Sequence, residues 1–189
     1  MIDIEKSCCF TGYRPDKFSF QFETDCTEHK IFTKRLNTAI SKAILSGCTN
    51  FYTGMAQGFD IVAAEQVALI KSINKKVKLT AVVPFKEQAS SWNEQWKRRY
   101  YALLDECDDV VIIHEKYEKW VFNERNRYMV DRCRYVLTYF DGKKGGTEST
   151  LKYAIKHGRV VTNIFNDDII GNDIKSYKAY FGLVSPESK

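Results

Sequence analysis

Two glycines, four residues apart, mark the stretch best suited to bind an anion, residues 53–60 (TGMAQGFD). One apolar run ends there and another begins, which predicts a strand, a tight turn and a helix starting near Gly58. Glycine accepts positive φ, and its missing Cβ lets another group approach the backbone. The N–H groups at a helix N-terminus favour a phosphate. We expect Gly54, Ala56 and Gly58 to contact a phosphate and Asp60 a ribose hydroxyl. The alternative is an ordinary turn with Asp60 as an acidic first-turn residue.

The loops after two other apolar runs have similar chemistry. One is a second glycine-rich passage from a β-type run into a helical pattern, where backbone N–H groups can again face a phosphate; a flexible loop is the alternative. The other ends the first apolar run and continues into a loop arginine, which either contacts an anion or is simply solvated. The residues expected to contact a ligand in these two loops are Gly145, Gly146, Thr147, Thr11, Gly12 and Arg14.

Two polar side chains interrupt the apolar stripe of a predicted helix at residues 119–133. Arg125 lies four residues from Val121 and Met129, and Asn126 stands beside it. Burying such groups without partners is costly, so they either pair with other protein groups or line a pocket. Trp92, in another helical stripe, belongs either to the core or against the base of a ligand.

These residues are positioned by strands that alternate with helices. We expect strands near residues 8–12, 51–53, 78–84, 109–113, 135–140 and 159–164, and helices near 31–46, 59–69, 92–104, 119–133 and 147–157. Residues 13–29 show no clear pattern. Such alternation predicts an α/β fold, a Rossmann-like three-layer αβα sandwich with a mainly parallel sheet. Ligands of such sheets bind beyond the carboxyl ends of the strands, where the candidate loops converge.

Composition narrows the class of protein. The 189 residues suit one domain, which we place at residues 1–165, followed by a polar tail at 166–189 with a possible short helix near 177–181. The N-terminus lacks a signal pattern and no apolar run is long enough to span a membrane, so we expect a cytoplasmic protein without a membrane partner.

The six cysteines contain no Cys-x-x-Cys pair and are predicted to be reduced core thiols; we expect neither a metal nor a cofactor. The net charge of +5, with scattered basic residues, favours a small anionic ligand and argues against nucleic acid.

Several motifs, in order, resemble the YpsA family of the SLOG superfamily, which also holds the lonely-guy phosphoribohydrolases and DNA-processing protein A. The resemblance covers roughly residues 5 to 165. The residues that carry it are Thr11-Gly12-Tyr13-Arg14-Pro15, residues 53–60, Val83-Pro84-Phe85 with Gln88 and Trp92, Arg125-Asn126 with Met129-Val130-Asp131, and Gly145-Gly146-Thr147.

The resemblance implies a Rossmann-like domain whose glycine motifs bind a nucleotide or an ADP-ribose-like ligand. Arg125 with Met129, and Gly146 with Thr147, look like the Arg-x-x-x-Met and Gly-Thr-x-x-Glu elements of lonely-guy enzymes. Here Thr150 stands at the position of their catalytic glutamate. Lys143-Lys144 also replaces part of their proline-glycine turn. A threonine cannot supply the carboxylate that glycosidic hydrolysis uses.

Three functions therefore remain open. The first is a sensor or regulator that binds a nucleotide-derived small molecule, with Arg14 and Arg125 neutralising phosphate. The second is a nucleoside-monophosphate phosphoribohydrolase, or another N-glycosidase, that uses Glu148 or Asp60 as its carboxylate. The third is a single-strand DNA binder, which the scattered basic residues argue against. Whether the protein is an enzyme stays open, and a homodimer is possible.

Overall fold

Six parallel strands form one sheet in the computed structural model, which describes residues 3–22 and 25–165. The strand order is β4-β3-β2-β1-β5-β6, with every neighbouring pair parallel. The strands are β1 (Ser7–Gly12), β2 (Asn50–Thr53), β3 (Lys78–Phe85), β4 (Asp109–His114), β5 (Tyr135–Tyr139) and β6 (Val160–Asn163). The predicted α/β, Rossmann-like sheet is therefore confirmed, and within the described ranges it is parallel throughout.

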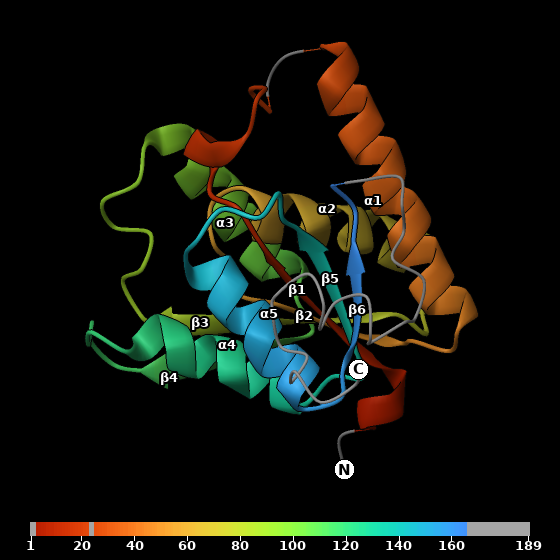
Figure 1. Cartoon of the computed structure of the whole chain (residues 1–189). Coiled ribbons are helices and arrows are strands. Elements are labelled where there is room, and N and C mark those ends of the chain that lie inside the picture. Colours follow the sequence, from red (N-terminus) through yellow and green to blue (C-terminus); the bar gives the residue numbers. More distant parts are fainter. Residues whose placement is uncertain (1–2, 23–24, 166–189) are drawn as a thin grey trace, which may run out of the picture.

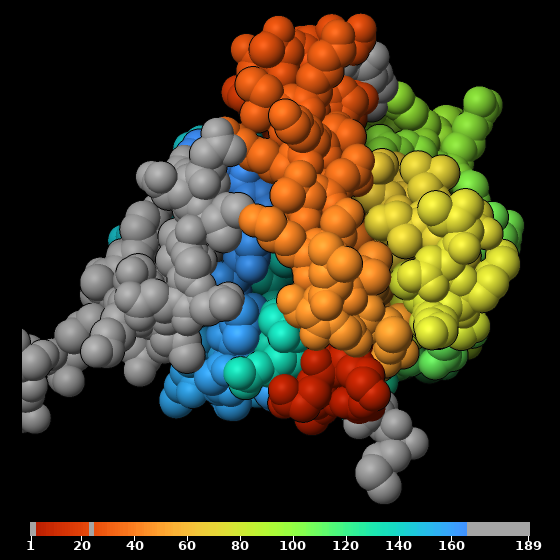
Figure 2. Space-filling model, turned by 90° about the vertical axis from the view of Figure 1, so that its right-hand side faces the viewer, coloured from red at the N-terminus to blue at the C-terminus, as the bar shows by residue number. Residues whose placement is uncertain are grey.

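Helices cover both faces of this sheet (Figure 1). One layer holds α1 (Thr27–Leu45), α2 (Phe59–Ile73) and α3 (Glu94–Glu106), and the opposite layer holds α4 (Val121–Asp131) and α5 (Gly146–Lys156). Figure 2 shows α1 beside α2 on the first of these faces. Two short 3-10 helices, η1 (Ile4–Lys6) and η2 (Pro15–Lys17), flank β1. The three-layer αβα sandwich is thus confirmed.

The chain reverses its direction of winding at β1. It adds β2, β3 and β4 in turn on one side of β1, then crosses to place β5 on the other side and β6 beyond it. Right-handed crossovers require the connecting helices to change face at that reversal, which separates α1–α3 from α4 and α5. The loops that leave β1 and β5 diverge there, so a crevice opens at the carboxyl edge of the sheet.

Buried aromatic residues of the core fix the position of β1 and of the start of α2 at the carboxyl edge of the sheet. β1 is buried along nearly its whole length, and Phe10 stacks on Phe51 of β2 and meets Phe59 of α2 edge-on. Such offset and edge-to-face contacts add stability beyond the area they bury. Phe59 is the first residue of α2, so its burial fixes where that helix starts relative to β1.

Two expectations differ from the structure. α1 begins at Thr27, four residues before the expected start. The apolar pattern missed the first turn (TEHK) because that turn carries no apolar stripe. The segment before it is packed: Phe18, Phe20 and Phe22 contact one another and Phe32 of α1.

The tail and its possible helix lie outside the described residues. Within the described ranges no helix combines the length and the apolarity that crossing a membrane requires.

Candidate functional site

A cavity of about 160 Å³ lies at the reversal point, beyond the carboxyl ends of β1 and β5. Its lining comes from the loops after β1, β2 and β5 and from the first half of α4. The lining residues are Thr11, Gly12, Tyr13, Arg14, Lys17, Ala56, Asp60, Phe122, Arg125, Asn126, Gly146 and Thr147. Nine of these are among the thirteen residues expected to contact a ligand, so the structure brings most of the candidate residues together.

An almost fully buried ion pair forms the floor of this cavity. The Arg125 Nη1 lies 3.6 Å from the Asp60 Oδ2 and also donates a hydrogen bond to the Gly54 carbonyl oxygen. Arg125 is 4% exposed and Asp60 5% exposed. The Arg125 Nε is buried without a hydrogen-bond partner in the described structure. Both alternatives for Arg125 therefore hold at once, because it pairs with protein groups and also lines a pocket.

Burial and mutual repulsion perturb the charges of this site. The pKa of Arg125 falls to about 10, because burial disfavours the charged guanidinium and Arg14 repels it, against the attraction of Asp60. Burial likewise lowers the pKa of Arg14, with the attraction of Asp60 opposing that shift. Burial raises the pKa of Asp60, and the two arginines and a hydrogen bond from the Ala56 backbone oppose the rise. Asp16, outside the lining, also attracts Arg14. Among the described lining residues, three cations (Arg14, Lys17 and Arg125) stand against one carboxylate, Asp60, which leaves an excess of positive charge.

The glycines of the first turn serve the protein's own packing. A Cβ on Gly54 would overlap the Arg125 guanidinium, and one on Gly58, which has a φ of +90°, would overlap the Tyr13 carbonyl oxygen. The Phe59 N–H donates to that Tyr13 carbonyl at 3.1 Å, and the Met55 N–H to the Thr53 hydroxyl at 3.2 Å. The structure therefore places an arginine, not open space, against the Gly54 backbone.

The second glycine turn is more open. A Cβ on Gly146 would meet nothing within 4 Å, and the Thr147 hydroxyl donates to the Gly12 carbonyl at 3.1 Å. That bond ties the start of α5 to the end of β1. Gly145 precedes the helix outside the lining, and Lys17 Nζ lies 3.3 Å from where its Cβ would stand. The start of α5 is thus the helix terminus with room beside it.

Three lining residues were not anticipated from the sequence. Tyr13 is buried, and its hydroxyl donates to the Asp141 carboxylate and accepts from the Asp141 and Lys143 N–H groups, both at 3.2 Å. Burial and the Asp141 carboxylate raise the pKa of Tyr13 to about 12. Lys17 is exposed and Phe122 half-buried, and the Arg14 guanidinium lies 5.9 Å from the centre of the Phe122 ring. A tyrosine–aspartate contact 128 residues apart leaves no local pattern in the sequence.

Trp92 and the candidate carboxylates lie in unexpected surroundings. Trp92 meets Tyr100 edge-on with ring centres 5.3 Å apart, and it is not among the lining residues. Glu148 also lies outside the lining and pairs with Lys152 at 2.7 Å. Thr150, at the position of the lonely-guy glutamate, is buried and donates to the Gly146 carbonyl at 2.9 Å. Asp60 is therefore the one carboxylate among the described lining residues, and it is held by Arg125.

Comparison with known proteins shows the family. The sequence model of the YspA SLOG family (YpsA) matches residues 8–168. The chain belongs to this family. It is 30% identical over 118 residues to the uncharacterized SPbeta prophage-derived protein YoqJ of Bacillus subtilis, covering 56% of this chain and 69% of that protein. It is 27% identical over 160 residues to a UPF0398 protein of Bacillus pumilus, covering 84% of each.

Two solved structures share the fold of this SLOG protein. DNA processing protein A of Helicobacter pylori, described by its single-stranded DNA binding mode, aligns with a TM-score of 0.60 at 15% identity, covering 97% of this chain and 76% of that one. DNA processing protein A of Streptococcus pneumoniae aligns with a TM-score of 0.58 at 20% identity. That alignment covers 88% of this chain, which spans 53% of the pneumococcal chain.

The sequence-based argument against a nucleic-acid partner is therefore wrong. A protein of the same fold binds single-stranded DNA, so the fold gives no ground for excluding that partner. The argument failed because a net charge of +5 is a sum over the whole chain. It does not report where basic side chains gather on the surface.

Proposed function

We propose that the cavity beside Arg14 and Arg125 binds the phosphate-bearing part of a nucleotide or ADP-ribose-like ligand, and that the protein acts as a sensor or regulator. One observation carries this proposal: two guanidiniums, one of them almost fully buried, line the cavity, and Asp60 is the one carboxylate among its described lining residues. A phosphate placed between them would accept charge-assisted hydrogen bonds, including one from the unpartnered Arg125 Nε. The open start of α5 would add backbone donors.

The size of the cavity indicates which part of the ligand it takes. A volume of about 160 Å³ is below the ~300–1,000 Å³ typical of pockets that hold a whole small molecule. The cavity would therefore enclose a phosphate with part of a ribose. The base would lie at the opening, where Phe122 and Arg14 stand.

Arg14→Gln tests the proposal more cleanly than any change to the buried pair. Arg14 is half-buried at the opening, so its loss does not strand a buried charge. Binding of AMP, ADP-ribose, NAD and cyclic nucleotides is measured by calorimetry and by thermal shift. Loss of a charged hydrogen bond costs about 1.5–3 kcal/mol, so we expect at least a tenfold weaker affinity for the ligand that binds.

Arg98→Gln, on the exposed surface of α3, is the matched control and should bind as the wild type does. Unchanged affinity in Arg14→Gln, or no binding by any of these compounds, would remove the proposal.

Single-stranded DNA binding is the second candidate, favoured by the shared fold with the Helicobacter pylori protein. A labelled oligonucleotide titrated at several salt concentrations tests it, because strand binding weakens steeply as salt rises. A phosphoribohydrolase is less favoured, because Asp60 is engaged by Arg125 and Glu148 by Lys152. Release of free base from nucleoside monophosphates would reinstate it.

A further inference from the structure

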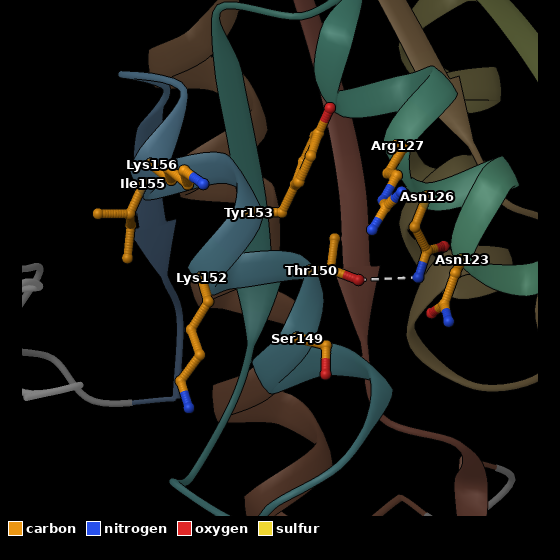
Figure 3. A pocket seen from close by; sticks show the side chains of 9 residues that line it. All are labelled: Asn123, Asn126, Arg127, Ser149, Thr150, Lys152, Tyr153, Ile155 and Lys156. Carbon is orange, nitrogen blue, oxygen red and sulfur yellow. Dashed lines mark hydrogen bonds between the residues drawn. The ribbon is translucent and has the colours of Figure 1, made fainter. Parts of the chain in front are cut away.

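A larger groove runs between α4 and α5, with a volume of about 690 Å³ (Figure 3). Residues spaced three or four apart on each helix line it, so each helix turns one face to the groove. The lining residues are Asn123, Asn126, Arg127, Ser149, Thr150, Lys152, Tyr153, Ile155 and Lys156.

The chemistry of this groove is basic with one aromatic ring. Arg127, Lys152 and Lys156 line it, whereas no acidic residue is among its described lining. The Arg127 guanidinium lies 5.4 Å from the centre of the Tyr153 ring, and Figure 3 shows it reaching from α4 toward α5. Two acids stand just outside: Glu148 pairs with Lys152 at 2.7 Å, and Asp131 accepts the Tyr153 hydroxyl at 2.8 Å.

Nearby carboxylates therefore neutralise only some of the positive charges of the groove. Arg127 and Lys156 have no carboxylate within ion-pair distance among the described residues. Both side chains are exposed, so their charges are available to a ligand. Basic side chains beside an aromatic ring match what a single nucleic-acid strand requires, namely cations for its phosphates and a surface on which a base can stack.

The groove and the arginine cavity meet at one residue. Asn126 lines both, and its Nδ2 donates to the Thr150 hydroxyl at 2.8 Å, the bond drawn in Figure 3. α5 likewise contributes to both, with Gly146 and Thr147 in the cavity and Ser149 and Thr150 in the groove. The Asn126–Thr150 bond links α4 to α5 at this junction, so a chain of nucleotides with one phosphate at Arg14 and Arg125 would pass over it to enter the groove.

We infer that the groove between α4 and α5 is a second subsite that takes the adjoining nucleotides of a single strand, so that an oligonucleotide binds more tightly than a mononucleotide. Arg127 and Lys156 contact the phosphates of the strand. The His157 ring lies 4.0 Å from the Tyr153 ring, centre to centre, and a base displaces it to stack on Tyr153. This inference rests on the function proposed for the arginine cavity, because that cavity holds the first phosphate.

The experiment compares AMP with fluorescein-labelled dT12 and with the dinucleotide dTpdT on the full chain. We expect the double variant Arg127→Ala/Lys156→Ala to bind dT12 at least tenfold more weakly than the wild type. Because each lost phosphate contact lowers the salt dependence of strand binding by about 0.7, its slope should fall by about 1.4. AMP affinity should change less than twofold. Lys34→Ala/Lys42→Ala, on exposed positions of α1 across the sheet, is the matched control and should leave all three affinities unchanged.

Two variants of Tyr153 distinguish base stacking from electrostatic attraction. Tyr153→Phe removes the hydroxyl that bonds Asp131 but keeps the ring, so it should bind dT12 as the wild type does. Tyr153→Ala should lose about tenfold. Equal loss in both variants would show that Tyr153 acts through Asp131 and would overturn its stacking role.

The outcomes distinguish this inference from the proposed function. Binding of AMP that Arg14→Gln abolishes, together with dT12 affinity no tighter than that of AMP, overturns the groove inference and leaves the proposed function standing. Strand binding that is unchanged in Arg14→Gln would overturn the proposed function and the groove inference with it, because the first phosphate would then lie outside the arginine cavity. dTpdT carries a single phosphate, so binding equal to that of dT12 would show that the groove contacts no further phosphate and would overturn the groove inference.

Discussion

Gly54 and Arg125 form the most restrictive contact between two residues at the site. Gly54→Ala would place a Cβ inside the volume of the guanidinium. We expect it to lower the free energy of unfolding by about 1–3 kcal/mol, as overpacking does. A Cβ on Gly54 would also stand 2.7 Å from the Asp60 Oδ2. In a background of Asp60→Ala with Arg125→Ala both obstacles are gone and no buried charge is left alone, so the same change should cost under ~0.5 kcal/mol. Urea unfolding of the four proteins measures the difference, and additive costs would contradict the contact.

The same contact shows where inference from the sequence stopped. The spacing of the two glycines correctly predicted a tight turn at the carboxyl end of a strand, because positive φ and close approach are local requirements. The group that approaches Gly54 comes from 71 residues further along the chain, so local sequence could not identify it. Tyr13, Lys17 and Phe122 were missed for the same reason, since nothing in their own neighbourhoods sets them apart.

Asp108 joins three elements just before β4. Its carboxylate accepts the Leu79 N–H of β3 at 2.9 Å and pairs with Lys71 of α2 at 2.9 Å and Lys78 of β3 at 3.0 Å. Burial tends to raise the pKa of Asp108, but these bonds outweigh it and lower the pKa to about 2. Its stabilising contribution should therefore be present above pH ~4 and lost as the pH falls from there toward 2.

Asp108→Asn tests these contacts of the Asp108 carboxylate through the pH dependence of the free energy of unfolding. We expect a loss on the order of 1 kcal/mol at pH 7, reduced from the full linkage value because water screens this partly exposed group. The difference from the wild type should shrink as the pH falls below 4. Asp105→Asn, on the exposed surface of α3, is the control. A constant difference from pH 7 to pH 2.5 would mean that the charge of Asp108 contributes nothing.

Elements were predictable where their apolar period was long. The helices at 59–73 and 94–106 and the strands at 78–85 and 109–114 fall where apolar spacing placed them. The first turn of α1 and the segment with Phe18, Phe20 and Phe22 did not, because a polar first turn and aromatic residues among polar ones match neither helical nor strand periodicity. The aromatic segment is held in place because Phe18 packs against Phe32 and Tyr139, which lie further along the chain.

The whole molecule explains why the candidate loops meet. β1 to β4 wind in one direction and β5 and β6 in the other, and the arginine cavity takes its lining from both halves. A parallel sheet inferred from alternating elements was enough to place the loops at one edge. It could not give the strand order, which decides that the loops after β1 and β5 are neighbours there.

A ligand in the cavity should therefore protect both halves of the sheet at once. With AMP or ADP-ribose at a hundred times its dissociation constant, the folded state gains about 2.7 kcal/mol. Hydrogen exchange should slow locally in residues 11–17, 54–60, 122–126 and 141–147, which surround the cavity. Exchange through local opening of β4 and α3 should not change, because both lie away from the cavity at the far side of the sheet. Protection confined to residues 54–60 would mean that the ligand binds the first glycine turn alone. The two halves would then meet for packing only, and the excess positive charge of Arg14 and Arg125 would have no ligand to balance it.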